Sequence, residues 1–416
     1  MLFLYNIVLG LYGLLLGLLA PFVPKAAAWV AGRRGLLAHI RHTIGHDPAP
    51  RVWFHCASLG EFEQGRPLLE AYRQAHPDTK LVLTFFSPSG YEIRKDWPGA
   101  DYIFYLPLDT RANARAFLDA VQPRLVVFVK YEFWYHFLNE AHQRRIPAVV
   151  VSAIFRPEQV FFKPWGRFFR KILTRFAHIF TQNEASAALL RTAGLTRVSV
   201  AGDTRFDTVV ATALAPARSL PLVDAFVADG APVLVVGSSW PEDLPILRPL
   251  LLRYAPEMRV LIAPHEVTEI NLRLVENVLP GQVQRYSQAN AATVAQARVL
   301  LFDNVGLLSQ LYRFGEYAYI GGAFGKGLHN TLEAAAFGLP LFFGPTYAKF
   351  QEAVELVAMK GAFPVHNAAE LEAAFTYLWN HDDARLRLQD TILDYVHDQA
   401  GATRTIMAAL PGLIPS

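Results

Sequence analysis

The feature that most constrains the fold of this chain is an alternation of short apolar runs with longer amphipathic stretches, which begins at Val52 and continues almost to the end. Each run has the length of a buried strand, and each intervening stretch has the length of a helix. Alternation of this kind is typical of a parallel sheet that is covered by helices on both faces. We therefore expect an α/β fold.

The apolar runs fall into two series, separated by a stretch rich in proline and alanine. The first series predicts strands at residues 52–55, 81–86, 102–105, 125–129, 148–152, 178–181 and 198–200. The second predicts strands at residues 233–237, 259–263, 282–286, 299–303, 317–321 and 341–343. No sequence repeat relates the two series, so their similarity is one of architecture.

A length of 416 residues fits two domains of ordinary size plus an appendage. We predict an N-terminal membrane anchor at residues 1–24 and a first Rossmann-like domain at residues 47–207. An inter-domain linker is expected at residues 208–231, followed by a second Rossmann-like domain at residues 232–416.

The composition favours contact with a membrane, because 52% of the residues are hydrophobic and only 18% are charged. Residues 2–24 contain no charged side chain, and as a helix they are long enough to cross ~30 Å of hydrocarbon. Lys25, Arg33 and Arg34 follow before the first acid, Asp47. By the positive-inside rule, the remainder of the chain is expected in the cytoplasm.

A cleaved signal peptide is the alternative to a retained anchor, since residues 26–28 are small. No lysine or arginine precedes the apolar stretch, however, and such a charge is typical of a signal peptide. The pattern favours a retained anchor.

Several classes of protein are disfavoured. A formal net charge of +3, without a lysine-rich tract or an RNA-binding signature, argues against nucleic acid as a partner. Cys56 is the single cysteine, which excludes a disulfide framework and favours a reducing compartment. No H-E-x-x-H or similar metal-ligand spacing is present. We expect no cofactor.

The loop after the first predicted strand has two interpretations. Ser58 and Glu61 match the S-x-x-E capping box of a helix N-terminus. Loops at the carboxyl ends of strands in an open α/β sheet are also where ligands bind, which places Glu61 within reach of a substrate. Both interpretations stay open on the spacing alone.

A glycine-rich stretch of the second domain reads I-G-G-A-F-G-K-G-L-H-N-T-L-E and includes Gly322 and Gly325. Its glycines allow a tight turn with exposed amides, and we expect a helix to begin near His329 or Asn330, which suits a phosphate. Glu333 is then near the ribose of a bound nucleotide.

Three further loops are expected at the same edge of the second sheet: G-S-S with Ser238, A-P-H-E with His265, and G-P at 344–345. A histidine alone is more often an ordinary core or surface residue. Together with the glycine-rich stretch, these loops predict a phosphate or sugar site.

The order and spacing of the motifs resemble the Kdo transferases, inner-membrane enzymes that move 3-deoxy-D-manno-octulosonic acid (Kdo) from CMP-Kdo to a lipid A precursor. The resemblance covers almost the whole chain. It is carried by the apolar N-terminus, S-L-G-E at 58–61, T-F-F-S-P-S-G at 84–90, P-L-D at 107–109, Y-E-F-W at 131–134, G-D-T-R-F-D at 202–207, G-S-S, A-P-H-E and the glycine-rich stretch.

The resemblance implies a GT-B fold, with two Rossmann-like domains that face each other across a cleft. The acceptor is expected on the first domain and the nucleotide sugar on the second. The implied function is an inverting, metal-independent glycosyltransferase that transfers Kdo from CMP-Kdo to lipid IVA in lipopolysaccharide core biosynthesis. Its implied location is the cell inner membrane, with cytoplasmic catalytic domains.

The resemblance also assigns roles to residues. Glu61 matches the base of the family, and Glu132 in Y-E-F-W matches a second required glutamate. His329, Asn330 and Glu333 match the nucleotide contacts. Further donor contacts are expected at Ser238, His265, Gly322 and Gly325. The anionic acceptor and sugar are expected to meet Ser58, Ser87, Lys130 and Arg156.

Two departures from the family pattern affect the donor site. The family often has an arginine beside the histidine of the second-domain loop, whereas this chain reads A-P-H-E, so Lys326 or Lys349 is a candidate replacement. Gly327 and Leu328 stand where a glycine pair is common, and Ala334 replaces a proline.

Two other functions compete with this assignment. Another GT-B enzyme, such as a nucleotide-sugar epimerase, uses a similar C-terminal pocket but needs no membrane anchor. A catalytically silent, membrane-tethered binding module predicts nucleotide binding without turnover. The presence of both Glu61 and Glu132 counts against such a module. As a base, Glu61 is expected to be ionised, because a helix N-terminus lowers the pKa of a carboxylate.

Overall fold

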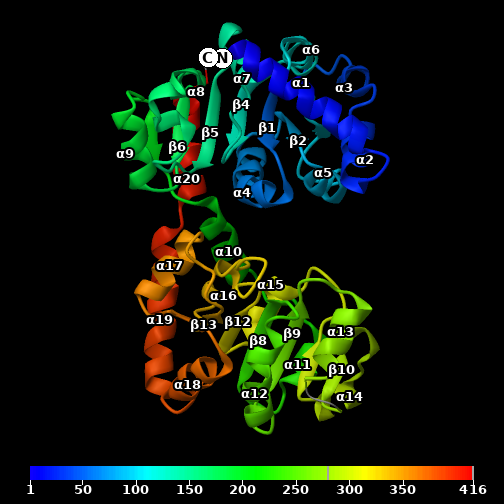
Figure 1. Cartoon of the computed structure of the whole chain (residues 1–416), viewed down its shortest axis with the longest axis vertical. Helices are drawn as coiled ribbons and strands as arrows, with labels where there is room; N and C mark the ends of the chain where they lie inside the picture. The colour runs from blue at the N-terminus through cyan, green and yellow to red at the C-terminus, as the bar shows by residue number, and fades with distance from the viewer. Residues whose placement is uncertain (279–280, 415–416) are drawn as a thin grey trace. The chain divides into compact units, whose positions relative to one another are not determined.

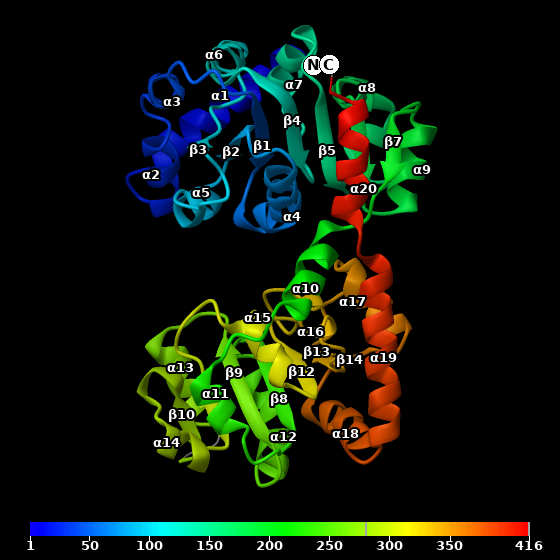
Figure 2. The ribbon, with the colours of Figure 1, turned by 180° about the vertical axis from the view of Figure 1, so that it is seen from behind.

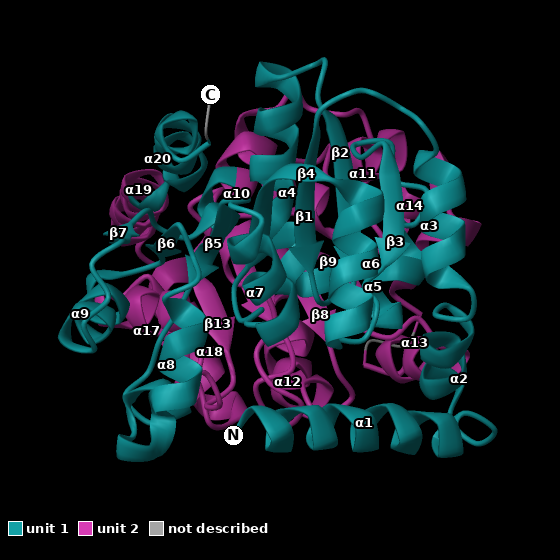
Figure 3. Cartoon of the chain, turned by 90° about the horizontal axis from the view of Figure 1, so that it is seen from above, with its two compact units in different colours: residues 1–207, 399–416 teal, residues 208–398 magenta. Residues whose placement is uncertain are grey.

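The computed structural model describes residues 1–278 and 281–414 and divides into two compact units (Figure 3). Unit 1 comprises Met1–Asp207 and Gln399–Ser416, and unit 2 comprises Thr208–Asp398. Each unit is built around its own 7-stranded parallel sheet. The α/β class expected from the alternation is confirmed.

The sheet of unit 1 has the strand order β3-β2-β1-β4-β5-β6-β7, and neighbouring strands run parallel (Figure 1). The strands are β1 (Arg51–Cys56), β2 (Lys80–Phe85), β3 (Tyr102–Tyr105), β4 (Pro123–Val129), β5 (Ala148–Ala153), β6 (His178–Thr181) and β7 (Val198–Val200). Each strand lies where the sequence predicts it, with small differences at the ends.

Strand β1 shows why these runs are apolar throughout. Successive side chains of a strand point to opposite faces of the sheet. Trp53 packs into a core shared with α3, α6 and α7, whereas Val52 and Phe54 pack into a second core shared with α4 and α20. Because helices cover both faces, both faces of β1 are largely apolar, and a buried polar residue such as His55 needs hydrogen-bond partners.

The helices of unit 1 connect these strands. They are α1 (Leu2–Leu19), α2 (Pro24–Ala31), α3 (Leu36–Ile44), α4 (Leu59–Ala75), α5 (Pro88–Arg94), α6 (Arg111–Val121), α7 (Tyr135–Gln143), α8 (Arg167–Leu173), α9 (Glu184–Thr192) and the C-terminal α20 (Ala402–Ala409), with short 3-10 turns η1 (Val160–Phe162), η2 (Pro164–Gly166) and η5 (Leu410–Gly412). Helix α10 (Thr204–Leu214) begins in unit 1 and continues into unit 2.

The sheet of unit 2 has the order β10-β11-β9-β8-β12-β13-β14, again with parallel neighbours. Its strands are β8 (Val233–Ser239), β9 (Arg259–Pro264), β10 (Val283–Arg285), β11 (Val299–Leu301), β12 (Tyr317–Ile320), β13 (Leu341–Phe343) and β14 (Ala362–Pro364). The sequence analysis missed β14, an edge strand. It is short and ends in a proline, which weakens a strand signal.

The helices of unit 2 surround this second sheet. They are α11 (Pro221–Phe226), α12 (Leu244–Tyr254), α13 (Glu269–Glu276), α14 (Ala291–Gln296), α15 (Leu308–Leu311), α16 (Leu332–Ala335), α17 (Gln351–Ala358), α18 (Ala368–Trp379) and α19 (Asp382–Gln399), with 3-10 turns η3 (Tyr286–Gln288) and η4 (Tyr312–Phe314).

The division into units differs from the predicted domains in two places. Residues 208–231, predicted as a linker, group with unit 2 and contain α11 and most of α10. Residues 399–416, predicted in the second domain, belong to unit 1. Both differences arise because the short segments pack against a core that is distant in sequence.

The C-terminal helix α20 lies against unit 1 (Figure 2). Ile406 and Leu410 are buried in the core that α4 shares with β1. The carboxylate of Asp207 accepts hydrogen bonds from the backbone N–H groups of Gly401 and Thr403. The last residue of the G-D-T-R-F-D motif therefore holds the start of α20 on unit 1.

Helix α1 lies along unit 1 with one narrow stripe packed against it (Figure 3). The partly buried positions are Tyr5, Leu9, Gly13, Leu16 and Ala20, at helical spacing, and the other side chains of α1 are exposed. Within the described residues, α1 is the one helix long and apolar enough to cross a membrane. The apolar helix is thus confirmed, whereas its insertion into a bilayer stays a prediction.

Candidate active site

The candidate residues of unit 1 follow three strands of its parallel sheet. Glu61 lies in the first turn of α4 after β1, Ser87 follows β2, and Lys130 and Glu132 follow β4. Strands β2, β1 and β4 are neighbours in the sheet. Since the carboxyl ends of parallel strands meet at one edge, these residues share that edge.

Glu132 is nearly buried and is held by two side chains. Its Oε2 lies 3.0 Å from Nε2 of His55 and accepts a hydrogen bond from Nε1–H of Trp134. His55 is fully buried on β1, and only 7% of Glu132 is exposed. A buried carboxylate with two donors is fixed in place, because losing either donor leaves a charge without its partner.

A second layer orients His55. Its Nδ1 lies 3.1 Å from the backbone carbonyl and 2.9 Å from Oγ1 of Thr84, which also accepts from Nε1–H of Trp53 at 2.7 Å. These contacts orient the imidazole ring, with Nδ1 towards Thr84 and Nε2 towards Glu132. His55 and Glu132 therefore form a buried, hydrogen-bonded pair.

Sequence analysis did not identify His55, Thr84 or Trp134 as members of the site. A histidine inside an apolar strand was the available signal, since a buried imidazole requires polar partners. Those partners lie on or directly after neighbouring strands that are distant in sequence. The network is therefore a tertiary feature.

Glu61 forms the capping box that the sequence predicts. Its Oε2 accepts from the backbone N–H of Ser58 at 2.9 Å and from the Ser58 hydroxyl at 3.2 Å. The capping interpretation of the pair is thus observed. It does not exclude the second interpretation, because capping occupies only one of the two carboxylate oxygens in the interactions described.

The electrostatics of Glu61 differ from the sequence expectation. Burial raises the pKa of Glu61, and the nearby charge of Glu132 raises it further, while His55 and Ser58 oppose the shift. The expectation of a pKa lowered by the helix N-terminus is therefore wrong in direction, because desolvation outweighs the dipole. A carboxylate with a raised pKa is a better proton acceptor once ionised.

The predicted anion contacts of unit 1 are less uniform. Ser87 caps α5 by accepting from the backbone N–H of Ser89. Lys130 adopts a φ of +67° at the end of β4, with its Nζ 5.4 Å from the ring centre of Tyr131. Arg156 is exposed, and its charge opposes the burial that raises the pKa of Tyr131. Lys130 and Arg156 thus both lie beside Tyr131.

The glycine-rich turn of unit 2 is organised by a buried carboxylate that sequence analysis missed. Asp243 accepts from the backbone N–H groups of Trp240 at 2.8 Å and Gly322 at 3.0 Å, and from the hydroxyl of Tyr319 at 2.9 Å. Gly322 has a φ of +94°, which favours glycine. Burial raises the pKa of Asp243, and these donors oppose the shift.

Beside this turn, three rings form a stack. The ring centres of His265 and His329 are 4.1 Å apart, and those of Trp240 and His265 are 4.8 Å apart. Nε1–H of Trp240 donates to Nε2 of His329 at 2.8 Å. Burial and the neighbouring His265 lower the pKa of His329 to about 4. His329 is therefore neutral near pH 7, with Nδ1–H available as a donor.

The predicted helix after the glycine-rich turn begins later than expected and is short. Helix α16 starts at Leu332, and before it the backbone N–H of His329 bonds to the carbonyl of Gly321. Asn330 accepts from the backbone N–H of Leu332 at 3.1 Å and donates to Oε1 of Glu333 at 3.0 Å. Asn330 and Glu333 are thus brought together, as the sequence predicts.

The remaining donor candidates lie around the stack. Ser238, at the end of β8, has a φ of +53°, an uncommon value for a residue with a side chain. Gly325 is exposed in the turn, next to Lys326, whose Nζ lies 5.8 Å from the Trp240 ring centre. Both candidate replacements for the missing arginine are exposed, Lys326 beside the Trp240 ring and Lys349 in the loop before α17.

The part of the chain that the structure describes contains no group of three or more His, Cys, Asp and Glu side chains suited to hold a metal ion. The two groups of site residues have different chemistry. Unit 1 offers a paired carboxylate network, and unit 2 offers a tight turn with a ring stack.

Comparison with known proteins identifies relatives of this chain. Residues 31–208 match a family model described as 3-deoxy-D-manno-octulosonic-acid transferase (kdotransferase). The 3-deoxy-D-manno-octulosonic acid transferase of Haemophilus influenzae is 25% identical over 410 residues, covering 95% of this chain and 93% of that protein. The transferase of the same name from Chlamydophila psittaci is 26% identical over 358 residues, covering 84% of this chain and 82% of that protein.

Among solved structures, the UDP-GlcNAc 2-epimerase of Neisseria meningitidis bound to UDP-GlcNAc has a similar fold. Its TM-score is 0.62 at 14% identity, over 87% of this chain and 100% of that one. At this identity the likeness concerns the fold alone. With two 7-stranded parallel sheets, it confirms the GT-B fold class.

Proposed function

Because this chain belongs to the Kdo transferase family, we propose that it is an inverting glycosyltransferase of lipopolysaccharide core biosynthesis. It moves Kdo from CMP-Kdo to the lipid A precursor lipid IVA. The main structural support for a catalytic site is the position of Glu61 beside the buried network of Glu132, where the pKa of Glu61 is raised.

Glu61 is the base of the proposed reaction. The acceptor hydroxyl is a poor nucleophile at neutral pH, so a carboxylate must take its proton as the new bond forms. The acceptor oxygen attacks the anomeric carbon of Kdo from the face opposite CMP. The bond from that carbon to the phosphate oxygen breaks, and CMP leaves with the electron pair. Base catalysis of this kind contributes ~10² to 10⁴ in rate.

Glu132 supports Glu61 from the interior. Its contacts with His55 and Trp134 keep its carboxylate in one position, and its charge keeps the pKa of Glu61 raised. The raised pKa makes the ionised form of Glu61 a stronger proton acceptor.

Unit 2 binds the donor in this proposal. The Nδ1–H of the neutral His329 and the ammonium group of Lys326 face the phosphate, where negative charge develops as CMP leaves. Glu333, next to Asn330, accepts the ribose hydroxyls. Ser238, His265, Gly322 and Gly325 shape the same site. We propose that His329 and Lys326 stabilise the leaving group without a metal ion.

Unit 1 binds the acceptor, and α1 attaches it to the inner membrane with both units in the cytoplasm. Ser58, Ser87, Lys130 and Arg156 supply donors and charges for the anionic sugar and the acceptor phosphates. The hydrogen bond from Tyr5 to Asp109 and the 2.7 Å contact of Asn6 with His136 hold α1 along unit 1.

The decisive experiment is product mass analysis after mixing the purified protein, CMP-Kdo and a tetraacyl lipid A precursor. We expect the acceptor to gain the mass of Kdo, with and without a metal chelator present. A reaction with UDP-GlcNAc in place of CMP-Kdo tests the epimerase alternative. Nucleotide binding without a change in acceptor mass would support the silent binding module and reject the proposal.

A further inference from the structure

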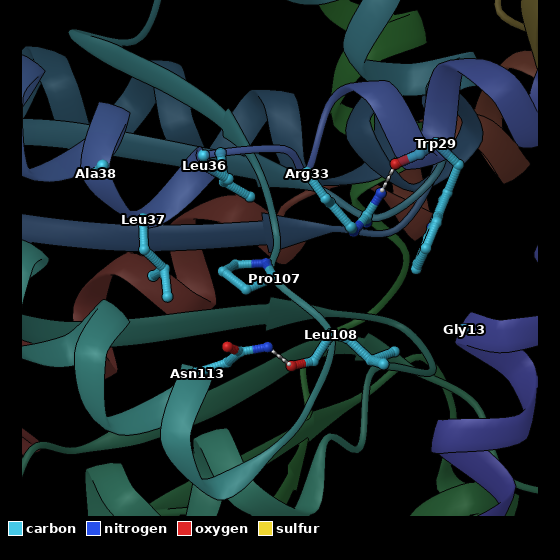
Figure 4. A pocket seen from close by; sticks show the side chains of 10 residues that line it. Gly13, Trp29, Arg33, Leu36, Leu37, Ala38, Pro107, Leu108 and Asn113 are labelled. Atoms are coloured by element: carbon cyan, nitrogen blue, oxygen red, sulfur yellow. Dashed lines mark hydrogen bonds between the residues drawn. The ribbon is translucent and has the colours of Figure 1, made fainter. Parts of the chain in front are cut away.

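A pocket of unit 1 lies next to the apolar helix and outside the polar site described above (Figure 4). Its volume is about 380 Å³, within the range of small-ligand sites. The residues that line it come from α1, α2, the α2–α3 turn, α3, the loop after β3 and α6: Gly13, Trp29, Arg33, Gly35, Leu36, Leu37, Ala38, Pro107, Leu108 and Asn113. Most of this lining is apolar.

Arg33 is the charged group of this pocket. Its guanidinium donates to the carbonyls of Trp29, Leu106 and Phe86, and it lies over the rings of Trp29, Phe86 and Tyr105. Burial lowers the pKa of Arg33 to about 9, so it remains charged near pH 7. Within the described residues, no carboxylate forms an ion pair with it. A half-buried cation of this kind favours an anionic ligand.

An aromatic run links the pocket to the candidate active site. The ring of Phe86 lies 5.8 Å from that of Trp29, at the pocket, and 4.8 Å from that of Trp134. Trp134 in turn donates to Glu132. The pocket is therefore connected to Glu132 through the rings of Trp29, Phe86 and Trp134.

The surroundings of the pocket fit a membrane surface. Gly13 of α1 contributes to its wall, while the exposed side chains of α1 include Leu14, Leu15 and Leu18. Residues 1–46 contain four lysines and arginines and no acid, so this part of unit 1 is basic. Apolar side chains beside basic groups are complementary to an anionic lipid.

We propose that the pocket beneath α1 holds an acyl chain of the lipid acceptor, with Arg33 placed for a phosphate of the same molecule. This inference rests on the proposed function and adds the subsite that takes the apolar part of the acceptor. Burial of the acyl chain in the pocket aligns the sugar end of the acceptor with the strand ends that carry Glu61 and Glu132. It also explains how a membrane-embedded substrate is presented to a polar site.

The test fills the pocket with a larger side chain. Ala38 is exposed on α3 and lines the pocket, so Ala38→Phe adds bulk there without disturbing the core. Ala31→Phe is the matched control, since Ala31 is exposed at the end of α2 and does not line the pocket. We expect Ala38→Phe to raise KM for the tetraacyl acceptor about tenfold, the equivalent of about two methylene groups left unburied.

The control variant should keep the wild-type KM, and both variants should keep the wild-type melting temperature. An unchanged KM in Ala38→Phe would overturn the acyl-chain assignment while leaving the proposed function intact. So would an equal rise in both variants. If the wild-type protein transfers no Kdo, the proposed function fails, and the pocket is then decided by direct labelling.

For that labelling, the full-length protein is irradiated with an acceptor that carries a photoreactive group on one acyl chain. We expect adducts in the peptides that span residues 33–38 or 107–113, and their loss in Ala38→Phe. Adducts confined to other segments would overturn the proposal. Equal labelling by a phosphatidylglycerol with the same photoreactive chain would also overturn it, because the occupant would then be bulk membrane lipid.

Discussion

The two candidate sites of this molecule solve different chemical problems with the same architecture. In unit 1, polar side chains converge after β1, β2 and β4, and the result is a buried carboxylate network with a raised pKa at Glu61. In unit 2, the corresponding strand ends carry a tight turn held by Asp243 and a stack of three rings, in which burial lowers the pKa of His329. Both sites use loops at the carboxyl ends of parallel strands.

The two sites differ in how burial changes the pKa of their ionisable side chains. In unit 1, burial keeps a carboxylate ready to accept a proton, because desolvation disfavours its charged form. In unit 2, burial keeps His329 neutral, which leaves N–H donors without adding charge. A proton acceptor on one unit and a donor-lined turn on the other is the division of labour expected for transfer between two substrates.

The largest expected effect tests the proposed catalytic site of unit 1. Glu61→Ala should lower kcat for Kdo transfer ~10²- to 10⁴-fold, because the acceptor hydroxyl loses its base. CMP affinity, measured by calorimetry, should stay unchanged since Glu61 belongs to unit 1. Glu70→Ala, an exposed carboxylate on the same helix, is the control. Residual activity above a few per cent would reject Glu61 as the base.

The second prediction tests the proposed nucleotide site of unit 2. A Cβ at Gly321 would lie 2.3 Å from the carbonyl oxygen of Ser238 and 2.6 Å from Cα of Ser239. Gly321→Ala should therefore displace the turn, destabilise unit 2 by about 1–3 kcal/mol and weaken CMP binding. At Gly325, a Cβ has its nearest neighbour at 3.7 Å, in the side chain of Glu242.

Gly325→Ala is thus the matched control, and its melting temperature should stay close to that of the wild type. Calorimetry with CMP and thermal unfolding compare the two variants. Equal CMP affinity in both would show that the turn does not hold the nucleotide.

A third variant sharpens the role of Glu132. Glu132→Gln removes a negative charge that raises the pKa of Glu61, and this charge has a larger effect than the opposing His55. The pKa of Glu61 should fall, so the limb of the kcat/KM profile that rises with pH should move to lower pH. Glu140→Gln, on α7, should leave the profile in place. A shift of that limb to higher pH would contradict the assigned electrostatics.

The smallest expected effect concerns the ring stack. The pKa of His329 is about 4 in the folded protein and ~6.5 when unfolded. Between these values the unfolded chain binds more protons, so the stability of unit 2 should fall as the pH drops from about 6.5 to 4.

His329→Asn should reduce that pH dependence, whereas His397→Asn, at an exposed position of the same unit, should not. Urea midpoints measured across this range test the difference. An identical slope in wild type and His329→Asn would show that His329 is not held neutral by burial.

The fold was largely predictable because its signal is local. Apolar runs such as that of β1 must be buried on both faces, and this requirement appears in the sequence as length and composition. The capping box at Ser58 and Glu61 was predictable for the same reason, since its partners are neighbours in the chain. β14 was not predicted, because a short apolar run that ends in Pro364 gives almost no local strand signal.

The site was predictable only in part. The pairing of Asn330 with Glu333 depends on near neighbours and followed the sequence, but α16 begins only at Leu332. The partners of Glu132 came from β1 and the loop after β4, and the support of the glycine-rich turn came from Asp243. None of these pairings has a periodic pattern.

The sequence by itself determined the architecture and the order of the motifs, because strand and helix periods and helix caps are set by residues close together in the chain. Only the tertiary structure decided that C-terminal α20 packs on unit 1, that α1 lies along that unit above a pocket, and that Glu61 has a raised pKa. The physical reason is that desolvation and charge coupling depend on what surrounds a group in space.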